Sequence, residues 1–150
     1  MIRQVELKKL DPRAEIPAYG SRDSAGVDLV ACINRAVDVP PLESRLINTG
    51  LAINMQPVVE DCVAFIIPRS GKGHKEGVVL GNLTGVIDQD YQGELKISVW
   101  NRNPDKYITI IPGDRIAQLV FLPIIKADFK VVDEFSTNTV RGEGGFGSTG

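Results

Sequence analysis

A basic, glycine-containing segment, PRSGKGHKEG at 68–77, carries groups suited to an anionic ligand. Arg69 offers a forked guanidinium that matches phosphate oxygens, and Ser70 adds a hydroxyl. Gly71 and Gly73 let backbone N–H groups approach a ligand closely. The segment predicts a phosphate site, although a polar turn with a solvated Arg69 explains the same residues equally well.

Two carboxylates and a tyrosine follow in GNLTGVIDQDYQG at 81–93. One of the carboxylates, Asp88 or Asp90, could act as a general base on water. Tyr91 could offer its ring face to a sugar or a base. Asp also favours turns, because its side chain hydrogen-bonds nearby backbone groups. A plain hairpin turn is therefore the alternative interpretation.

The segment PGDRIAQLVF at 112–121 places Arg115 and Gln118 in an otherwise apolar strand after a Pro-Gly-Asp turn. Both side chains could simply point to solvent. However, residues separated by an odd number face opposite sides of a regular strand. We therefore expect a β-bulge or a buried partner for at least one of them.

The C-terminal stretch RGEGGFGSTG at 141–150 contains the pattern GxGxxG. A dinucleotide-binding fingerprint must open a helix after a strand, and the sequence given stops at Gly150, so this interpretation fails. Phosphate binding would instead use loop amides, Arg141, Ser148 and Thr149. A glycine-rich terminus is more often disordered, but Phe146 favours a segment that covers something, such as a nucleobase.

The elements that must position these groups are short strands. Apolar, β-branched runs are bounded by Gly, Pro, Asn and Asp, and ELKISVW at 94–100 alternates, with Leu95, Ile97 and Val99 on one side. We expect strands at 5–10, 26–33, 45–53, 62–68, 77–80, 94–101, 107–111, 115–124 and 128–135. At most a short helical turn is expected, near SGKGHKEG. The pattern predicts an all-β sandwich, barrel or jelly roll.

The composition bounds the function. A chain of 150 residues with 43% hydrophobic and 24% charged residues is typical of one soluble globular domain. We expect a domain over 1–135 and a C-terminal arm over 136–150, where apolar residues thin out. The net charge of −2 gives no field that attracts nucleic acid or a membrane, so neither is expected as a partner. The absence of an apolar leader, and two cysteines in apolar surroundings (Cys32 and Cys62), suggest a cytoplasmic protein.

Together, SAGVDLVA (24–31), the three segments above and RGEGGFGSTG resemble the five motifs of the trimeric dUTPases, closest to the bacterial members. The motifs occur in the expected order and spacing over nearly the whole chain. The resemblance implies a β jelly-roll subunit in a homotrimer whose active sites combine motifs of several subunits. It implies hydrolysis of dUTP to dUMP and diphosphate with Mg²⁺ on the triphosphate, which keeps uracil out of DNA and supplies dUMP for dTMP synthesis.

The resemblance also implies roles for single residues. Asp88 is similar to the carboxylate that activates water for attack at the α-phosphorus, and Asp28 to an aspartate that supports the metal through water. Tyr91 resembles the ring that fills the space of a ribose 2′-OH, and Phe146 the ring that stacks on uracil. The backbone of a hairpin expected over 85–97 resembles the edge that reads uracil. The remaining substrate-binding residues implied are Arg69, Ser70, Gly71, Asn82, Gly85, Val86, Ile87, Lys96, Gln118, Arg141, Gly147, Ser148 and Thr149. Arg115 is expected in an interface ion pair and Asp90 in the turn.

Alternatives remain at this level. A dCTP deaminase would share the jelly roll but lacks a GVIDQDY-type motif followed by RGEGGFGSTG. A nucleotide-binding protein without turnover would not need a carboxylate at Asp88, and a structural β domain would make the five motifs accidental. One departure from the family pattern is Lys72, where an apolar residue is commoner.

Overall fold

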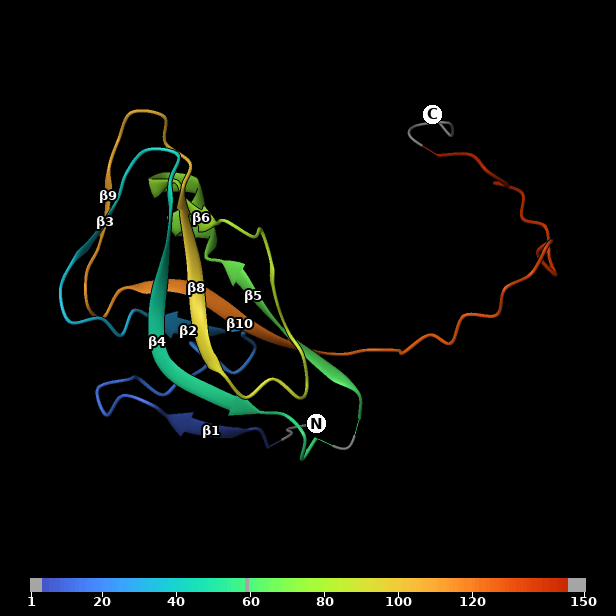
Figure 1. Ribbon diagram of the computed structural model, residues 1–150, viewed down its shortest axis with the longest axis horizontal. Coiled ribbons are helices and arrows are strands. Elements are labelled where there is room, and N and C mark those ends of the chain that lie inside the picture. Colours follow the sequence, from blue (N-terminus) through green and yellow to red (C-terminus); the bar gives the residue numbers. More distant parts are fainter. Residues whose placement is uncertain (1–3, 59, 146–150) are drawn as a thin grey trace.

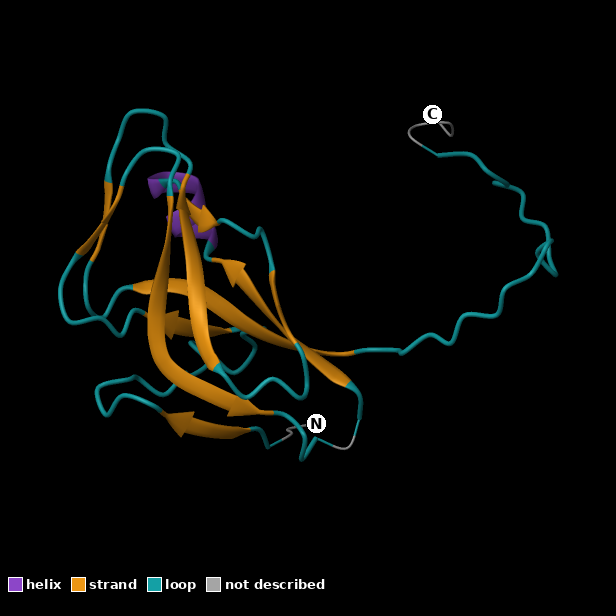
Figure 2. Ribbon diagram, viewed as in Figure 1, coloured by secondary structure: helices purple, strands orange, loops and turns teal. Residues whose placement is uncertain are grey.

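The structure is a computed structural model that describes residues 4–58 and 60–145. Within these residues the chain forms two four-stranded antiparallel sheets and one two-stranded ribbon (Figures 1 and 2). The strands are β1 (Glu6–Lys9), β2 (Val27–Val30), β3 (Val37–Val39), β4 (Ser44–Asn54), β5 (Cys62–Pro68), β6 (Val78–Leu80), β7 (Gly85–Ile87), β8 (Glu94–Asn101), β9 (Ile108–Ile110) and β10 (Arg115–Pro123). The predicted all-β jelly-roll fold is confirmed, and none of the described helices is long and apolar enough to cross a membrane.

The first sheet has the order β1-β4-β8-β6 and is built around the long β4–β8 pair. Leu95, Ile97 and Val99 of β8 are buried, as their alternation predicts, and their neighbours along the strand are more exposed. These side chains join a core that also takes Leu29 from β2 and Leu119 from β10. Because each sheet turns one apolar face inward, the core lies between the two sheets.

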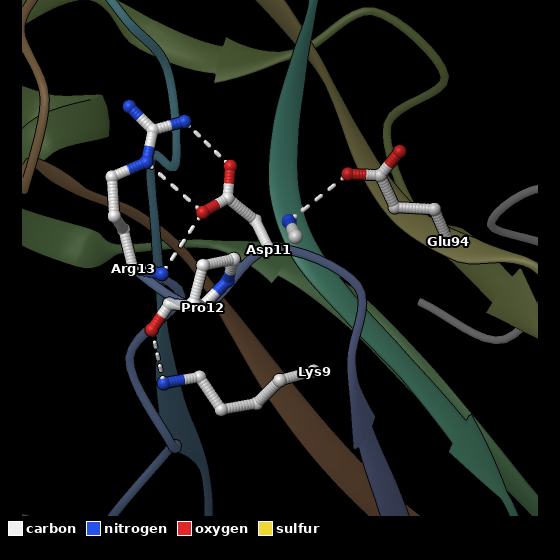
Figure 3. A network of polar contacts seen from close by, with 6 residues as sticks. Lys9, Asp11, Pro12, Arg13 and Glu94 are labelled. Carbon is white, nitrogen blue, oxygen red and sulfur yellow. Dashed lines mark hydrogen bonds and ion pairs between the residues drawn. The ribbon is translucent and has the colours of Figure 1, made fainter.

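β4 is irregular at Gly50, where its register against β8 shifts between Asn48 and Ala52. Gly50 has φ +67°, and a Cβ there would lie 3.0 Å from the Asp11 side chain. The Gly50 N–H donates to Glu94 Oε1 at 3.0 Å, and beside it Asp11 accepts hydrogen bonds from the Arg13 backbone and guanidinium (Figure 3). This network fastens loop 10–14 over the bulge, so its role is structural.

The second sheet has the order β2-β10-β5-β7 and carries most of the predicted site residues. The register of β10 against β2 shifts between Arg115 and Ala117, and Ile116 and Ala117 are consecutive buried residues. The bulge expected from the odd spacing of Arg115 and Gln118 is therefore confirmed. The bulge changes which side of the sheet the β10 side chains point to between Arg115 and Gln118.

Two details differ from the sequence-based expectation. β3 and β7 were not expected as strands, because each has only three residues and no readable alternation. Segment 85–97 is not a hairpin: β7 pairs with β5 in one sheet and β8 with β4 and β6 in the other. In contrast, the short helical turn expected near SGKGHKEG is confirmed as η1 (Lys72–Glu76), a single π-helical turn.

The chain beyond Pro123 forms no strand in its described part and extends away from the two sheets (Figure 1). The strand expected at 128–135 is therefore wrong for the single chain, because no described segment pairs with it. Its start is fixed by Asp61, whose carbonyl accepts from the Ile124 N–H at 3.0 Å and whose carboxylate accepts from Lys126 Nζ at 2.7 Å. The Asp61 carboxylate raises the pKa of Lys126 above its usual value. The division into 1–135 and 136–150 stays a prediction.

Candidate functional site

A carboxylate between two guanidinium groups forms the first half of the candidate site. Arg69 Nε donates to Asp28 Oδ1 at 2.8 Å, and Arg115 Nη1 lies 3.5 Å from Asp28 Oδ2. The Asp28 and Arg69 side chains are 23% and 29% exposed, so the pair is partly shielded from water, while Arg115 is 64% exposed. We call these three residues the Asp28 cluster. Arg115 forms an ion pair within its own chain, whereas the ion pair expected for it at a subunit interface stays a prediction.

Gln118 extends this half of the site. Its Cα pairs with Asp28 across β2 and with Ile67 across β5, one residue before the end of that strand. A cavity of about 290 Å³ lies beside these residues and is lined by Gly20, Ser24, Ala25, Gly26, Asp28, Ile67, Gln118 and Val120. Three of the predicted motifs thus meet on one sheet, because β10 lies between β2 and β5.

The segment after Arg69 turns into η1, with Ser70 and Gly71 exposed at its start. Nothing lies within 4 Å of a Cβ built on Gly71, so its backbone is open to a ligand. Lys72 Nζ pairs with Glu76 Oε2 at 2.8 Å within the same turn. The extra positive charge at Lys72 is therefore neutralised locally, next to the Arg69–Ser70–Gly71 stretch.

The second half of the candidate site is the turn Asp88–Tyr91, closed by the Tyr91 N–H donating to the Asp88 carbonyl at 3.1 Å. The Asp88 side chain is exposed and has no hydrogen-bond or ion-pair partner among the described residues. Tyr91 Oη donates to the Glu94 carbonyl at 3.1 Å. A Cβ on Gly93 would lie 2.5 Å from Tyr91 Oη, so Gly93 makes room for the ring. We call residues 88–91 the Asp88 turn.

The predicted base-reading residues precede this turn. Gly85 is buried, and a Cβ there would lie 3.1 Å from Ile66 Cβ, so β7 packs closely on β5. Val86 is exposed and Ile87 lies partly buried against the core. Asn82 lies near Gly85, whereas Lys96 lies on the other sheet, 3.8 Å from Glu94. The segment leaves the backbone of an edge strand, β7, available to a planar ligand.

The two halves lie at opposite ends of β5. Ile87, the residue before Asp88, pairs with Ala64 near the start of β5, whereas Arg69 follows its end. Five residues separate Ala64 from Arg69, which corresponds to roughly 17 Å along a strand. A single chain therefore does not bring Asp88 next to the Asp28 cluster.

The predicted C-terminal residues are placed only in part. Arg141 lies on the extended segment, where its Nε donates to the Gly144 carbonyl at 2.8 Å. Phe146, Gly147, Ser148 and Thr149 lie outside the described residues.

The candidate site offers few side chains that could coordinate a metal ion. Within the described residues no group of three or more His, Cys, Asp or Glu side chains is arranged to hold one. Asp28 is a single carboxylate whose oxygens face Arg69 and Arg115. Mg²⁺ commonly takes one or two carboxylates together with water and substrate phosphates. The residues therefore fit a metal that is held mainly by a phosphorylated ligand.

Two other features contain none of the predicted site residues. The Arg13 side chain holds the pKa of Asp11 far below its usual range, but this pair belongs to loop 10–14. A cavity of about 1010 Å³ is lined mainly by apolar side chains, among them Leu7, Ile53, Leu95 and Phe121, and by none of the predicted site residues. Neither the lowered pKa of Asp11 nor this cavity therefore points to the residues predicted from the sequence.

Comparison with known proteins agrees with the motif arrangement. A family model described as dUTPase matches residues 12–150. Curated deoxyuridine 5'-triphosphate nucleotidohydrolases from Photorhabdus laumondii and Tolumonas auensis are 51% and 54% identical, and each alignment covers at least 99% of both chains.

Solved structures give the same result. The dUTPase of Staphylococcus bacteriophage 80alpha, solved with dUpNHpp, superposes with a TM-score of 0.89 at 30% identity, covering 99% of each chain. A mutant dUTPase from phage phi11 of S. aureus, whose structure shows the coordination of a structural Mg(II) ion, has a TM-score of 0.79 at 26% identity. It covers 90% of this chain, and the alignment spans 100% of the phage protein.

Proposed function

This chain belongs to the dUTPase family, and we propose that it hydrolyses dUTP to dUMP and diphosphate through a water activated by Asp88. The observation that carries this proposal is the exposed Asp88 carboxylate, which has no partner among the described residues. Its lone pairs are therefore available to accept a proton from water as the water attacks the α-phosphorus. This reaction would keep uracil out of DNA by removing dUTP, and it would supply dUMP for dTMP synthesis.

The Asp28 cluster would bind the triphosphate. Because Arg69 uses Nε for Asp28, its two terminal nitrogens stay available for phosphate oxygens, in a direction that the ion pair fixes. The amide of Gln118 and the open backbone at Ser70–Gly71 would add neutral donors. Phosphoryl transfer depends mostly on such positioning and on stabilisation of charge. Mg²⁺ bound to the triphosphate would neutralise developing negative charge, with Asp28 contacting it through water.

The edge strand β7 and Tyr91 would select the nucleoside. Backbone N–H and C=O groups of 85–87 would present a fixed pattern to uracil, against which cytosine leaves buried groups unpaired. The Tyr91 ring is held by Glu94 and Gly93, so it would exclude a ribose 2′-OH. Arg141 and residues 146–149 would complete the site as a lid over the γ-phosphate and the base.

We also propose a homotrimer with composite sites. One support is the roughly 17 Å that separates the Asp88 turn from the Asp28 cluster along β5. A second support is the arm, on which Ile125, Phe129, Val131 and Phe135 are almost fully exposed. Large apolar side chains on an extended segment gain little in water, and a second copy would bury them. Asp88 of one subunit would then act on a triphosphate held by the Asp28 cluster of another.

The function is tested by incubating the protein with dUTP, dCTP, dTTP and UTP in the presence of Mg²⁺ and measuring diphosphate. We expect release from dUTP far above that from the other three. Diphosphate release from dCTP without a preference for dUTP would refute the proposed function.

The composite site is tested by mixing two inactive variants, Asp88→Asn and Arg69→Ala, under conditions that let subunits exchange. If Asp88 and Arg69 of one site come from different subunits, some mixed trimers contain a site with both natural residues. Activity should then reappear on mixing, and size-exclusion chromatography should show trimers. No recovery despite demonstrated exchange would place both residues of a site in one chain.

A further inference from the structure

Gln89, the residue directly after Asp88, makes side-chain contacts with a segment about thirty residues earlier in the chain. Its Nε2 lies 3.3 Å from the Met55 carbonyl, 3.1 Å from that of Val58 and 3.4 Å from that of Glu60. Its Oε1 accepts from the Cys62 N–H at 3.4 Å. The three carbonyls belong to the β4–β5 connection (55–61), and Cys62 is the first residue of β5.

The surroundings fix the orientation of this amide. Three carbonyl oxygens face the NH₂ group and one N–H faces the oxygen, so the reverse orientation would oppose acceptor to acceptor. Each contact is longer than the common N–H···O distance of about 2.9 Å. Two hydrogens are shared among three acceptors, so the set of contacts, rather than any single bond, holds the side chain.

The position of Gln89 in the fold gives these contacts a consequence. The ladder between β7 and β5 ends with Ile87 and Ala64, and Gln89 continues it with a side chain in place of the backbone. The Asp88 carboxylate has no partner among the described residues that would hold it directly. Its location therefore depends on the backbone of the Asp88 turn, which the Gln89 side chain ties to the rest of the fold.

The other end of the same turn has a separate attachment. Tyr91 Oη donates to the Glu94 carbonyl, and Gly93 leaves the space for its ring. Loss of the Gln89 contacts would thus release Asp88 while Tyr91 keeps its hydrogen bond. A substitution at Gln89 can therefore displace Asp88 without displacing the Tyr91 ring.

We infer that Gln89 is a positioning residue for the water-activating carboxylate, acting through the contacts of its side-chain amide with the β4–β5 connection. This inference rests on the proposed function, in which Asp88 is the base. A neutral amide suits the role because it is both donor and acceptor. A carboxylate at 89 would set negative charge against three carbonyl oxygens, and an apolar side chain would leave the Cys62 N–H without this acceptor.

The test compares Gln89→Met, which keeps the length of the side chain but not its hydrogen bonds, with the natural protein. Diphosphate release from dUTP gives kcat and KM, and a non-hydrolysable dUTP analogue gives Kd. We expect kcat to fall roughly tenfold or more, since displacement of a catalytic group by about 1 Å can cost up to a hundredfold. KM and Kd should stay near the natural values, because the groups that bind the nucleotide keep their contacts.

The matched control is Asn54→Ala. The Asn54 side chain accepts from the Gln56 N–H at the start of the same connection and donates to Glu6 on β1, and it has no hydrogen bond with the Asp88 turn. The Asn54→Ala variant should lower the midpoint temperature of thermal unfolding without lowering kcat. If Gln89→Met fails to fold, Gln89→Asn, which keeps the amide but is one methylene shorter, replaces it.

The outcomes separate the two proposals. If the natural protein releases no diphosphate from dUTP, the proposed function fails. If it does, and the Gln89 variant keeps its kcat while its thermal midpoint falls, Gln89 is only structural and the inference is overturned. An equal loss of kcat in Asn54→Ala would also overturn it, because the effect would then come from general loosening of the connection.

Discussion

Two aspartates at opposite edges of one sheet, Asp28 on β2 and Asp88 directly after β7, have opposite surroundings. Asp28 lies between Arg69 and Arg115 and is partly shielded, so its oxygens are occupied by cations. Asp88 is exposed on a turn, without a partner among the described residues, and the turn is held by the neutral amide of Gln89. A carboxylate held between cations can organise charge, whereas one with free lone pairs can take a proton. This difference supports the proposed division, in which the first region binds phosphate and the second activates water.

The largest effect is expected at Asp88. Asp88→Asn keeps the shape of the side chain but removes the base, so kcat should fall by about 10²–10⁴, the usual contribution of a positioned acid or base. Binding of a dUTP analogue, measured by calorimetry, should persist. Asp90→Asn makes the same change two residues away in the same turn and should leave kcat nearly intact. Near-normal turnover in Asp88→Asn would show that Asp88 is not the base, so the proposed difference in role between Asp28 and Asp88 would fail.

Removal of residues 141–150 should have the next largest effect. The proposed lid contacts the γ-phosphate and the base, so kcat/KM should drop by about tenfold to a hundredfold when these positioning contacts are lost. The oligomeric state, measured by light scattering, should not change. Unaltered kinetics would leave the site to the Asp28 cluster and the Asp88 turn alone.

Arg69→Lys tests the first region. Lysine keeps the charge but cannot bond Asp28 and phosphate in the fixed geometry of a guanidinium. We expect kcat/KM to fall about 10- to 100-fold, which corresponds to about 1.5–3 kcal/mol for one hydrogen bond to a charged group. The matched change Arg115→Lys should cost less, because Arg115 is 64% exposed and its contact with Asp28 is 3.5 Å. An equal cost at both positions would contradict a special role for Arg69.

Gly93→Ala tests the second region without altering its charge. The added Cβ would lie 2.5 Å from Tyr91 Oη, so the ring must shift from its place. Discrimination between dUTP and UTP should decrease by about tenfold, within the range of about 1–3 kcal/mol for changes in a shaped pocket. The ratio of kcat/KM values for the two nucleotides measures this effect. An unchanged ratio would mean that Tyr91 does not exclude the 2′-OH.

The smallest effect is expected from Asp11, outside both regions. Arg13 lowers the pKa of Asp11 in the folded protein, so the pair stabilises the fold above the unfolded carboxyl pKa of about 4 and loses this effect as pH falls. The difference in thermal midpoint between the natural protein and Asp11→Asn should thus be constant near neutral pH and shrink in acid. Turnover at neutral pH should be unaffected. A difference that persists in acid would point to packing rather than charge.

The sequence predicted the parts of this molecule whose signals are local. Alternation identified the buried face of β8, and the odd spacing of Arg115 and Gln118 revealed the β10 bulge. Both follow from side-chain geometry within one strand, so no knowledge of partners is needed.

The missed features depend on partners that are distant along the chain. β7 is a strand because β5 lies beside it, and its three residues with a leading Gly85 carry no period of their own. The expected strand at 128–135 has the right residue types but no neighbour in the single chain. Gln89 was not among the residues predicted from the sequence, since its contacts lie 27 to 34 residues away. No local pattern could have revealed that anchor.

Because the arm is attached at Asp61, the length of chain between Ile124 and Arg141 limits how far Arg141 can lie from β5. Arg141 follows Ile124 by 17 residues, which span at most roughly 60 Å when fully extended. A flexible chain of that length would have a root-mean-square span of roughly 20–25 Å, somewhat more than the length of β5 between the two halves of the site. A tether of this kind keeps its end group at an effective concentration on the order of millimolar. Closure over a bound nucleotide would thus be an intramolecular step that needs only weak contacts, which suits an enzyme that must reopen after every turnover.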